Sequence, residues 1–305
     1  MNLPALLDNT KDIELRPVAE REGSIIAYRR ILIAVIRDIQ RAVSELVLPT
    51  YARGLLDSVN DERGTTRRRT AFTVVNQRVG LSVNTANRKM EILFDDEQKS
   101  HLVRISASIK KGTGLDVAPY LNMNRDEIDL LVKLYIEQNA TLIKSLSDDL
   151  VNKVEAAVYR AKVDRTTYVE LTKILQKQYG IAKNRADLIA FDQLASINSD
   201  FSRSRAESVG LKKFRWRTRM DGDRVRPLHR QLNGQIFEWG KPTLAENGLP
   251  PGKPVRCRCN AVPLLPANEK AVAAQEKLRR ELTKSNTAAR AKAKAEAKAR
   301  RQASN

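Results

Sequence analysis

Apolar residues recur at helical spacing through most of the chain before residue 210. From Ser24 to Val47 they return every three or four positions and share one face, which predicts an amphipathic helix capped by Ser24. A later series predicts one or two short helices over residues 70–94. Four further helices are expected, at residues 125–146, 148–161, 167–180 and 184–207. The third begins with a Thr-x-x-Glu capping box and ends at Gly180.

Residues 95–124 interrupt this helical pattern. They contain an acidic cluster at 95–97 and a Lys-Lys-Gly-Thr-Gly run at 110–114, which is typical of a segment between domains. Within it, His101 to Ile109 is a candidate strand. His101 has no partner at a spacing typical of catalysis, so we expect a structural role for this histidine.

The pattern changes to two-residue alternation after residue 213. Phe214, Trp216 and Thr218 alternate with three arginines, which predicts a strand. Residues 235–239 and 255–261 are two further strand candidates, and the prolines between them require a loop. Both tryptophans, both cysteines and one of the two histidines lie between 214 and 265. We expect a small β-containing module whose core holds Trp216, His229 and the Cys-x-Cys pair.

These patterns predict an α+β fold that is predominantly helical. Residues 1–120 form a mostly helical N-terminal region that begins with an irregular arm. Residues 121–266 form four helices that feed the β-containing module. After Pro266 large apolar residues become rare, and residues 267–305 form a tail rich in Ala, Lys and Arg that has no apolar stripe to bury.

The charge of the chain is strongly one-sided. Lys and Arg total 55 against 36 acidic residues, giving a formal net charge of +19 and a sequence pI near 10.1. The tail from 267 holds eleven Lys or Arg and four Glu, a net charge of +7. This favours a polyanionic partner, with nucleic acid as the first candidate and an acidic protein surface as the second, over a tail that only adds solubility. The candidate phosphate contacts are Arg290, Lys292, Lys294, Lys298, Arg300 and Arg301.

His229, Cys257 and Cys259 are candidate metal ligands, because zinc binds imidazole and thiolate. The alternative is that His229 is a hydrogen-bonded scaffold residue and that the cysteines are small buried apolar groups. A single Cys-x-Cys is not the usual zinc knuckle. We therefore expect no resident cofactor, with zinc as the open alternative, and both cysteines reduced.

Asp221, Asp223 and His229 admit two interpretations. A carboxylate pair with a histidine can hold a divalent ion and activate water, as in a metal-dependent nuclease. Alternatively, Asp-Gly-Asp forms a turn whose aspartates pair with Arg224, Arg226 or Arg258 and shape the module. The second interpretation is the one we adopt. The chain has no Gly-rich phosphate loop and no nucleophile elbow, and we expect no enzymatic activity.

The ordered motifs of the C-terminal half resemble the phage Mu F-like head-morphogenesis family. Segments 139–145 and 184–190 are similar to helices that precede the module in that family, although Phe191 stands where the family more often carries Arg. The resemblance covers about residues 125–266. The matching positions in the module are Trp216, Asp221, Asp223, Arg226, His229, Leu232, Gly234, Pro251, Pro254, Cys257, Arg258 and Cys259.

This resemblance implies a minor head protein of a tailed phage or prophage. Such a protein acts in head morphogenesis, contacts the portal and other capsid or scaffold proteins, and handles packaged DNA. We accordingly expect it in the capsid interior near the portal, and in the host cytoplasm during assembly. A signal peptide and a membrane helix are not expected from the pattern of the chain. The alternative function is a metal-dependent nuclease or other DNA-processing enzyme that uses Asp221, Asp223 and His229.

Overall fold

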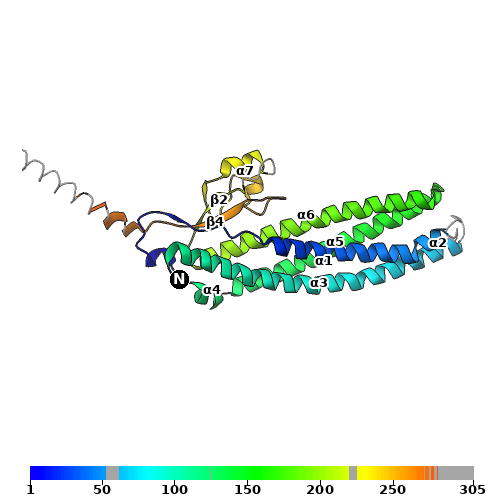
Figure 1. The fold of residues 1–305 in the computed structure, drawn as a ribbon, viewed down its shortest axis with the longest axis horizontal. Helices are drawn as coiled ribbons and strands as arrows, with labels where there is room; N and C mark the ends of the chain where they lie inside the picture. Colours follow the sequence, from blue (N-terminus) through cyan, green and yellow to red (C-terminus); the bar gives the residue numbers. More distant parts are fainter. Residues whose placement is uncertain are drawn as a thin grey trace, which may run out of the picture.

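Four long helices run side by side and form an elongated bundle (Figure 1). They are α1 (Glu22–Leu46), α3 (Glu62–Thr113), α5 (Asp126–Val163) and α6 (Tyr168–Ser208). Two short helices lie between them, α2 (Leu48–Ala52) and α4 (Ala118–Met123). This computed structural model describes residues 1–52, 62–123, 125–219 and 225–280, except positions 271, 275, 278 and 279.

The apolar stripe of each long helix holds the bundle together. On α1, Leu32, Ile36, Ile39 and Val43 share one face and are fully buried. They belong to a continuous core with residues of α3, α5 and α6. Each such side chain contributes about 1.5–3 kcal/mol by leaving water. The predicted amphipathic helix over 24–47 is therefore confirmed, with its ends shifted by two residues or fewer.

The helices are longer than the sequence pattern predicted. Helices expected at 125–146 and 148–161 are one helix, α5, and those at 167–180 and 184–207 are one helix, α6. Gly180 does not end a helix, because the buried stripe continues across it through Tyr179, Ala182 and Ala186. The capping box at the start of α6 is confirmed: the Thr167 side chain accepts from the Glu170 backbone N–H.

The predicted strand from His101 to Ile109 is wrong. This segment lies inside α3, which continues to Thr113 and leaves no interdomain linker over 95–113. The burial pattern explains the difference, because Glu97, His101, Ile105 and Ile109 are all buried at four-residue intervals. The sequence prediction counted only apolar residues, and two members of this buried stripe, Glu97 and His101, are polar. The helical spacing of the stripe was therefore not recognised.

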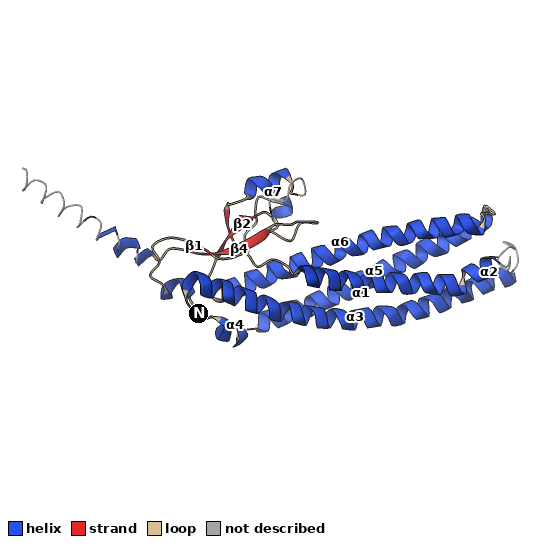
Figure 2. Ribbon diagram, in the orientation of Figure 1, coloured by secondary structure: helices blue, strands red, loops and turns tan. Residues whose placement is uncertain are grey.

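A four-stranded antiparallel sheet lies beside one part of the bundle (Figure 2). Its strands are β1 (Ile13–Glu14), β2 (Lys213–Arg217), β3 (Ile236–Glu238) and β4 (Asn260–Leu265), in the order β1-β4-β2-β3. The predicted alternation on β2 is confirmed, since Phe214 and Trp216 are buried. Trp216 pairs with Ala261 of β4.

The last strand begins later than predicted. Residues 255–259 are not part of β4, which starts at Asn260. The Cys257 backbone N–H instead donates to the Pro254 carbonyl at 2.9 Å, and Arg256 has a positive φ of 57°. These features are typical of a turn, so the apolar-polar alternation around the cysteines arises without a strand.

The N-terminal arm is part of the sheet and its core. It supplies β1 at the sheet edge and a short 3-10 helix, η1 (Leu3–Leu6). Leu3, Leu15 and Val18 pack in a second core with Phe214 and Trp239 of the module. The arm was expected to be irregular, and the sequence pattern did not indicate that two residues of it would pair with β4.

The predominantly helical α+β class is confirmed by these elements. The predicted boundary between residues 120 and 121 falls inside α4, and buried residues on both sides of it belong to one core. Among the residues that the structure describes, no helix is long and apolar enough to cross a membrane.

Candidate functional site

Three potential metal ligands converge inside the β-containing module. His229 Nδ1 lies 3.7 Å from Cys257 Sγ and 3.5 Å from Cys259 Sγ. The ligand atoms of all three residues lie within 4.8 Å of one another. Their exposed fractions are 2%, 2% and 4%. The structure thus brings together the three residues that the sequence marked as candidate ligands, and it buries all of them.

Local backbone features place these three side chains. Pro227 begins the short helix α7 (Pro227–Leu232), where its fixed φ suits the first turn, and α7 carries His229 inward. The turn from Pro254 to Cys257 brings both thiols toward the imidazole. The Gly252 backbone N–H donates to Cys257 Sγ at 3.4 Å. Trp216 packs edge-on against His229, with ring centroids 5.1 Å apart.

Glu246 fixes the orientation of His229. Glu246 lies in a 3-10 turn, η3 (Glu246–Gly248), and its Oε2 is 2.7 Å from His229 Nε2. The other carboxylate oxygen lies 3.3 Å from Arg226 Nη1, and Arg226 Nη2 also donates to the Val255 carbonyl at 2.5 Å. A carboxylate at Nε2 favours the tautomer that carries its proton there. The Nδ1 lone pair therefore faces the two thiols.

The two thiols differ in their affinity for a proton. The hydrogen bond from Cys259 lowers the pKa of Cys257 to about 6, although burial opposes this shift. The hydrogen bond to Cys257 and burial raise the pKa of Cys259 well above its ordinary range. A buried thiol of lowered pKa that faces an imidazole nitrogen is suited to bind a soft or borderline cation.

The remaining motif residues have structural roles where the structure describes them. Trp216 is fully buried in the small core that also contains Leu232 and both cysteines. Gly234 makes a turn with a φ of 88°, and its N–H donates to the Trp216 carbonyl at 2.8 Å. The Arg258 guanidinium lies 5.9 Å from the centre of the Phe191 ring.

Several predicted positions lie outside the described residues. Asp221 and Asp223 are among them, so their expected pairing with Arg224, Arg226 or Arg258 stays a prediction. The six proposed phosphate contacts of the tail also fall there: Arg290, Lys292, Lys294, Lys298, Arg300 and Arg301. Arg226 does bind a carboxylate, but that carboxylate belongs to Glu246.

The proline-rich loop of the module docks closely on α6. The hydroxyl of Ser199 donates to the Pro251 carbonyl at 2.7 Å. Gly252 has a φ of 87°, and a Cβ at this position would lie 2.9 Å from the Ala195 carbonyl oxygen. Lys253 Nζ lies 2.5 Å from Asp200 Oδ2 and donates to the Tyr135 hydroxyl at 3.0 Å. This tightly fitted loop is therefore one of the contacts that fix the module to the bundle, beside the second core.

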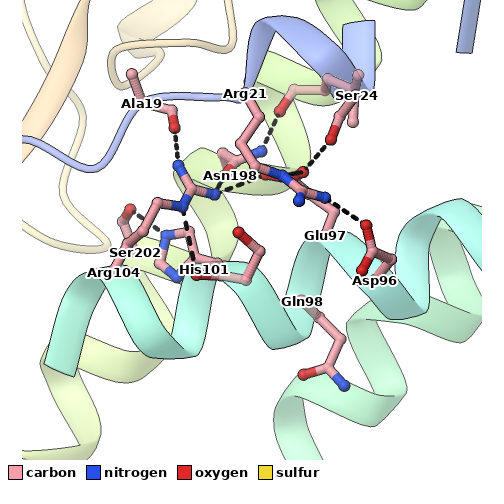
Figure 3. A network of polar contacts seen from close by, with 12 residues as sticks. Ala19, Arg21, Ser24, Asp96, Glu97, Gln98, His101, Arg104, Asn198 and Ser202 are labelled. Atoms are coloured by element: carbon pink, nitrogen blue, oxygen red, sulfur yellow. Dashed lines mark hydrogen bonds and ion pairs between the residues drawn. The ribbon is translucent and has the colours of Figure 1, made fainter. Parts of the chain in front are cut away.

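A second buried polar cluster lies inside the bundle, where the N-terminal arm meets α3 (Figure 3). Glu97 is fully buried and accepts hydrogen bonds from Arg21 Nε at 2.8 Å and Arg104 Nη2 at 2.7 Å. The Ser24 hydroxyl donates to it at 2.5 Å. Two guanidinium groups thus balance this carboxylate, which explains how a buried charge is tolerated.

His101 occupies the other half of this cluster. Arg205 Nη1 donates to His101 Nδ1 at 2.7 Å, and His101 Nε2 lies 3.0 Å from the Ser202 hydroxyl. Burial, with the charges of Arg205 and Arg104, holds the pKa of His101 well below its ordinary range. Burial also lowers the pKa of Arg205 to about 9, so Arg205 stays charged at neutral pH. The expected structural role of His101 agrees with this environment.

Glu246, Glu97 and Arg205 were not identified from the sequence. Glu246 lies in a loop 17 residues from His229, and no regular spacing connects the two. Arg205 is 104 positions from its partner His101, and the two meet only because α3 and α6 pack together. Glu97 likewise meets Arg21, 76 positions away, only through the packing of the chain. One sequence feature could have indicated this cluster. Glu97 and His101 are four residues apart, which places both on the buried face of one helix.

Comparisons with known proteins give a match in the C-terminal half. Residues 152–262 match the family described as Phage Mu protein F like protein. A protein of Haemophilus influenzae, described as uncharacterized, is 28% identical over 277 residues. The aligned region is 89% of this chain and 60% of that protein, so the chain spans about three fifths of its relative. No solved structure matches.

Proposed function

We propose that this chain, whose residues 152–262 form a domain of the Phage Mu protein F-like family, is a minor head protein of a tailed phage or prophage. It acts in head morphogenesis within the assembling capsid, contacts the portal, and binds packaged DNA without sequence preference. The family match is the observation that carries this proposal. It covers α6, the strands β2 and β3, the start of β4 and the cysteine motif, which are the parts of the chain with the most specific sequence.

The charge of the chain supports a role at DNA. The net charge is +19, and the tail from residue 267 contributes +7 of it. More than half of the excess therefore lies before the tail. Contacts to phosphate depend on charge and not on base sequence, which suits a protein that meets every part of a packaged genome.

An exposed apolar stripe supports contact with another protein. Leu81, Ile92 and Val103 on α3 are 70%, 71% and 68% exposed. They are eleven residues apart, which corresponds to three helical turns, so they share one face. They lie about 16 Å apart along the helix, so they are separate apolar anchor points on one face and not a continuous patch. We assign this stripe to contact with the portal or a neighbouring capsid protein.

Binding to DNA is tested with the purified full-length chain and random-sequence duplex DNA over a salt series. Affinity should fall steeply with salt. A variant in which the six tail residues Arg290 to Arg301 named above are changed to Gln should show a shallower salt slope, by up to about 5 in log–log units if all six contact phosphate. The matched control changes six exposed bases of the bundle to Gln: Arg37, Arg88, Lys89, Lys133, Lys173 and Lys177.

If the salt slope of DNA binding changed equally in the tail variant and in the control, the tail would have no special role in binding. Absence of binding at low salt would overturn the DNA part of the proposal. The same samples, incubated with Mg²⁺, are examined for cleavage. Cleavage that disappears with Asp223→Ala or His229→Ala would favour the nuclease alternative. We expect intact DNA, because His229 is 2% exposed and its Nε2 is bound to Glu246.

Contact with the portal is tested by cross-linking and mass spectrometry of assembling heads. Cross-links between α3 and portal subunits are expected. Changing Leu81, Ile92 and Val103 to Ser should reduce the copies of the chain in heads. The control changes Val163 and Val169 to Ser, which are 51% and 61% exposed near the α5–α6 connection. Absence of the chain from heads would overturn this part of the proposal.

A further inference from the structure

We propose that His229, Cys257 and Cys259 bind one zinc ion that holds the β-containing module in its folded form. This inference rests on the geometry of the module and is independent of the proposed function. It replaces the sequence-based expectation of no cofactor. The described residues supply three ligands, and a tetrahedral ion would take its fourth from outside this set.

The distances agree with one shared ion. With a Zn–N bond of about 2.0–2.1 Å, a Zn–S bond of about 2.3 Å and tetrahedral angles, the ligand nitrogen and sulfur are about 3.6 Å apart. The observed separations from His229 Nδ1 are 3.7 Å to Cys257 Sγ and 3.5 Å to Cys259 Sγ. Both nitrogen–sulfur separations therefore agree with those of a tetrahedral site, and all three ligand atoms lie within 4.8 Å of one another.

The imidazole by itself does not satisfy both thiols. The Nδ1 atom of a neutral imidazole has one in-plane lone pair and accepts one hydrogen bond well. Two thiols nevertheless lie at almost the same distance from it. A metal ion between the three atoms satisfies both sulfurs and the nitrogen at once. Both cysteines are free and buried.

The surroundings of the three atoms match those of known zinc ligands. A histidine that binds a metal through one nitrogen usually donates its other N–H to a carboxylate, which orients the ring. Glu246 occupies that position, 2.7 Å from His229 Nε2. The Gly252 backbone N–H donates to Cys257 Sγ, which stabilises a thiolate ligand.

The burial of the site indicates a structural ion. Cys257, Cys259 and His229 come from two separate chain segments, and the core that surrounds them has few members: Trp216, Leu232, Ala245 and the two cysteines. Such a small core gains much of its stability from a metal when one is bound. An ion here would link α7 to the segment before β4.

The first test is the metal content of the full-length chain, expressed in zinc-containing medium and purified without a metal-affinity tag. We expect about one zinc per chain by mass spectrometry. After exchange with Co²⁺, thiolate-to-cobalt charge-transfer bands and the visible bands of tetrahedral cobalt should appear. A chain without bound zinc whose Co²⁺ form shows neither set of bands would overturn the proposal.

Variants then locate the ion. Cys257→Ser and Cys259→Ser should each lose most of the zinc and the charge-transfer bands. Glu246→Gln leaves the three ligands in place and should weaken zinc affinity by about 10–100-fold. Leu232→Ala is the matched control, because it opens the same small core without removing a ligand, and it should keep about one zinc. Full zinc content in both cysteine variants would place the ion elsewhere and overturn the proposal.

Discussion

The bundle and the β-containing module each bury one histidine, but the two environments differ. His101 in the bundle uses both ring nitrogens on protein groups, Arg205 and Ser202. His229 in the module binds Glu246 through one nitrogen and faces two thiols with the other. Both ring nitrogens of His101 therefore have partners within the protein. The second environment brings three donor atoms within 4.8 Å of one another, and this grouping is the basis of the proposed zinc site.

The difference shows that burial of a histidine does not by itself identify a site. The histidine of the bundle lies in a helix stripe beside a balanced set of charges, and its polar neighbours stabilise the packing of α3 on α6. The histidine of the module lies among short elements with a small core. Substitutions in the two regions should separate these two kinds of contribution.

Glu97→Ala should lower the free energy of unfolding of the bundle by about 3–5 kcal/mol, because it leaves two guanidinium groups without their buried carboxylate. Arg21 and Arg104 both bind Glu97. The measurement is urea unfolding followed by helical circular dichroism. Glu91→Ala, at an exposed position of the same helix, should change the free energy by less than about 0.5 kcal/mol. Similar losses for both variants would contradict a special role of Glu97.

Gly252→Ala should destabilise the docking of the module by about 2–3 kcal/mol. It combines a positive φ with a Cβ that would lie 2.9 Å from the Ala195 carbonyl oxygen. Gly234→Ala is the matched control, since Gly234 has the same positive φ but nothing within 4 Å of an added Cβ. It should cost only about 1 kcal/mol. Unfolding followed by tryptophan fluorescence compares the two, and equal effects would rule out the close approach to α6.

Stability of the bundle should fall as the pH drops below the ordinary pKa of histidine. The pKa of His101 is held well below 6.5 in the folded protein, mainly by burial. Below about pH 6.5 the unfolded chain therefore binds a proton that the folded chain does not, and each pH unit costs up to about 1.4 kcal/mol. Urea unfolding of the wild type and His101→Gln between pH 7.5 and 5 measures this. The pH slope of the variant should be shallower, and parallel slopes would contradict the assignment.

Tyr135→Phe should cost about 0.5–1.5 kcal/mol, the usual contribution of a hydrogen bond. The Tyr135 hydroxyl donates to Asp200 Oδ2 at 2.8 Å and accepts from Lys253 of the docked loop. The control is Tyr168→Phe, because Tyr168 is 47% exposed. Thermal unfolding followed by fluorescence should show a lower midpoint for the first variant only. An unchanged midpoint for Tyr135→Phe would mean that this bond does not hold the loop.

The sequence predicted those parts of the fold that depend on local periodicity. The stripe of α1, the Thr167 capping box and the alternation around Trp216 all appear where expected. The full lengths of the helices could not be predicted in the same way. Polar residues such as Glu97 and His101 occupy buried helical positions, and a search for apolar spacing ignores them. The pairing of β1 with β4 joins residues about 250 positions apart and has no local signature.

The candidate site was predicted in part. His229, Cys257 and Cys259 were recognised by residue type, but their convergence depends on the turn at Arg256 and on α7. The sequence around the cysteines alternates like a strand, although the structure forms a turn there. Glu246 could not be linked to His229 because tertiary packing alone brings the two together.

The most direct test compares the two regions in one sample during chelation. Both tryptophans, Trp216 and Trp239, are buried in the module, so their fluorescence reports on the module while helical circular dichroism reports mainly on the bundle. Thermal unfolding of the full-length chain is recorded with and without a strong zinc chelator. A bound ion predicts that the chelator lowers the fluorescence midpoint and leaves the helical transition nearly unchanged. Fluorescence transitions that coincide with and without chelator would contradict a metal-held module.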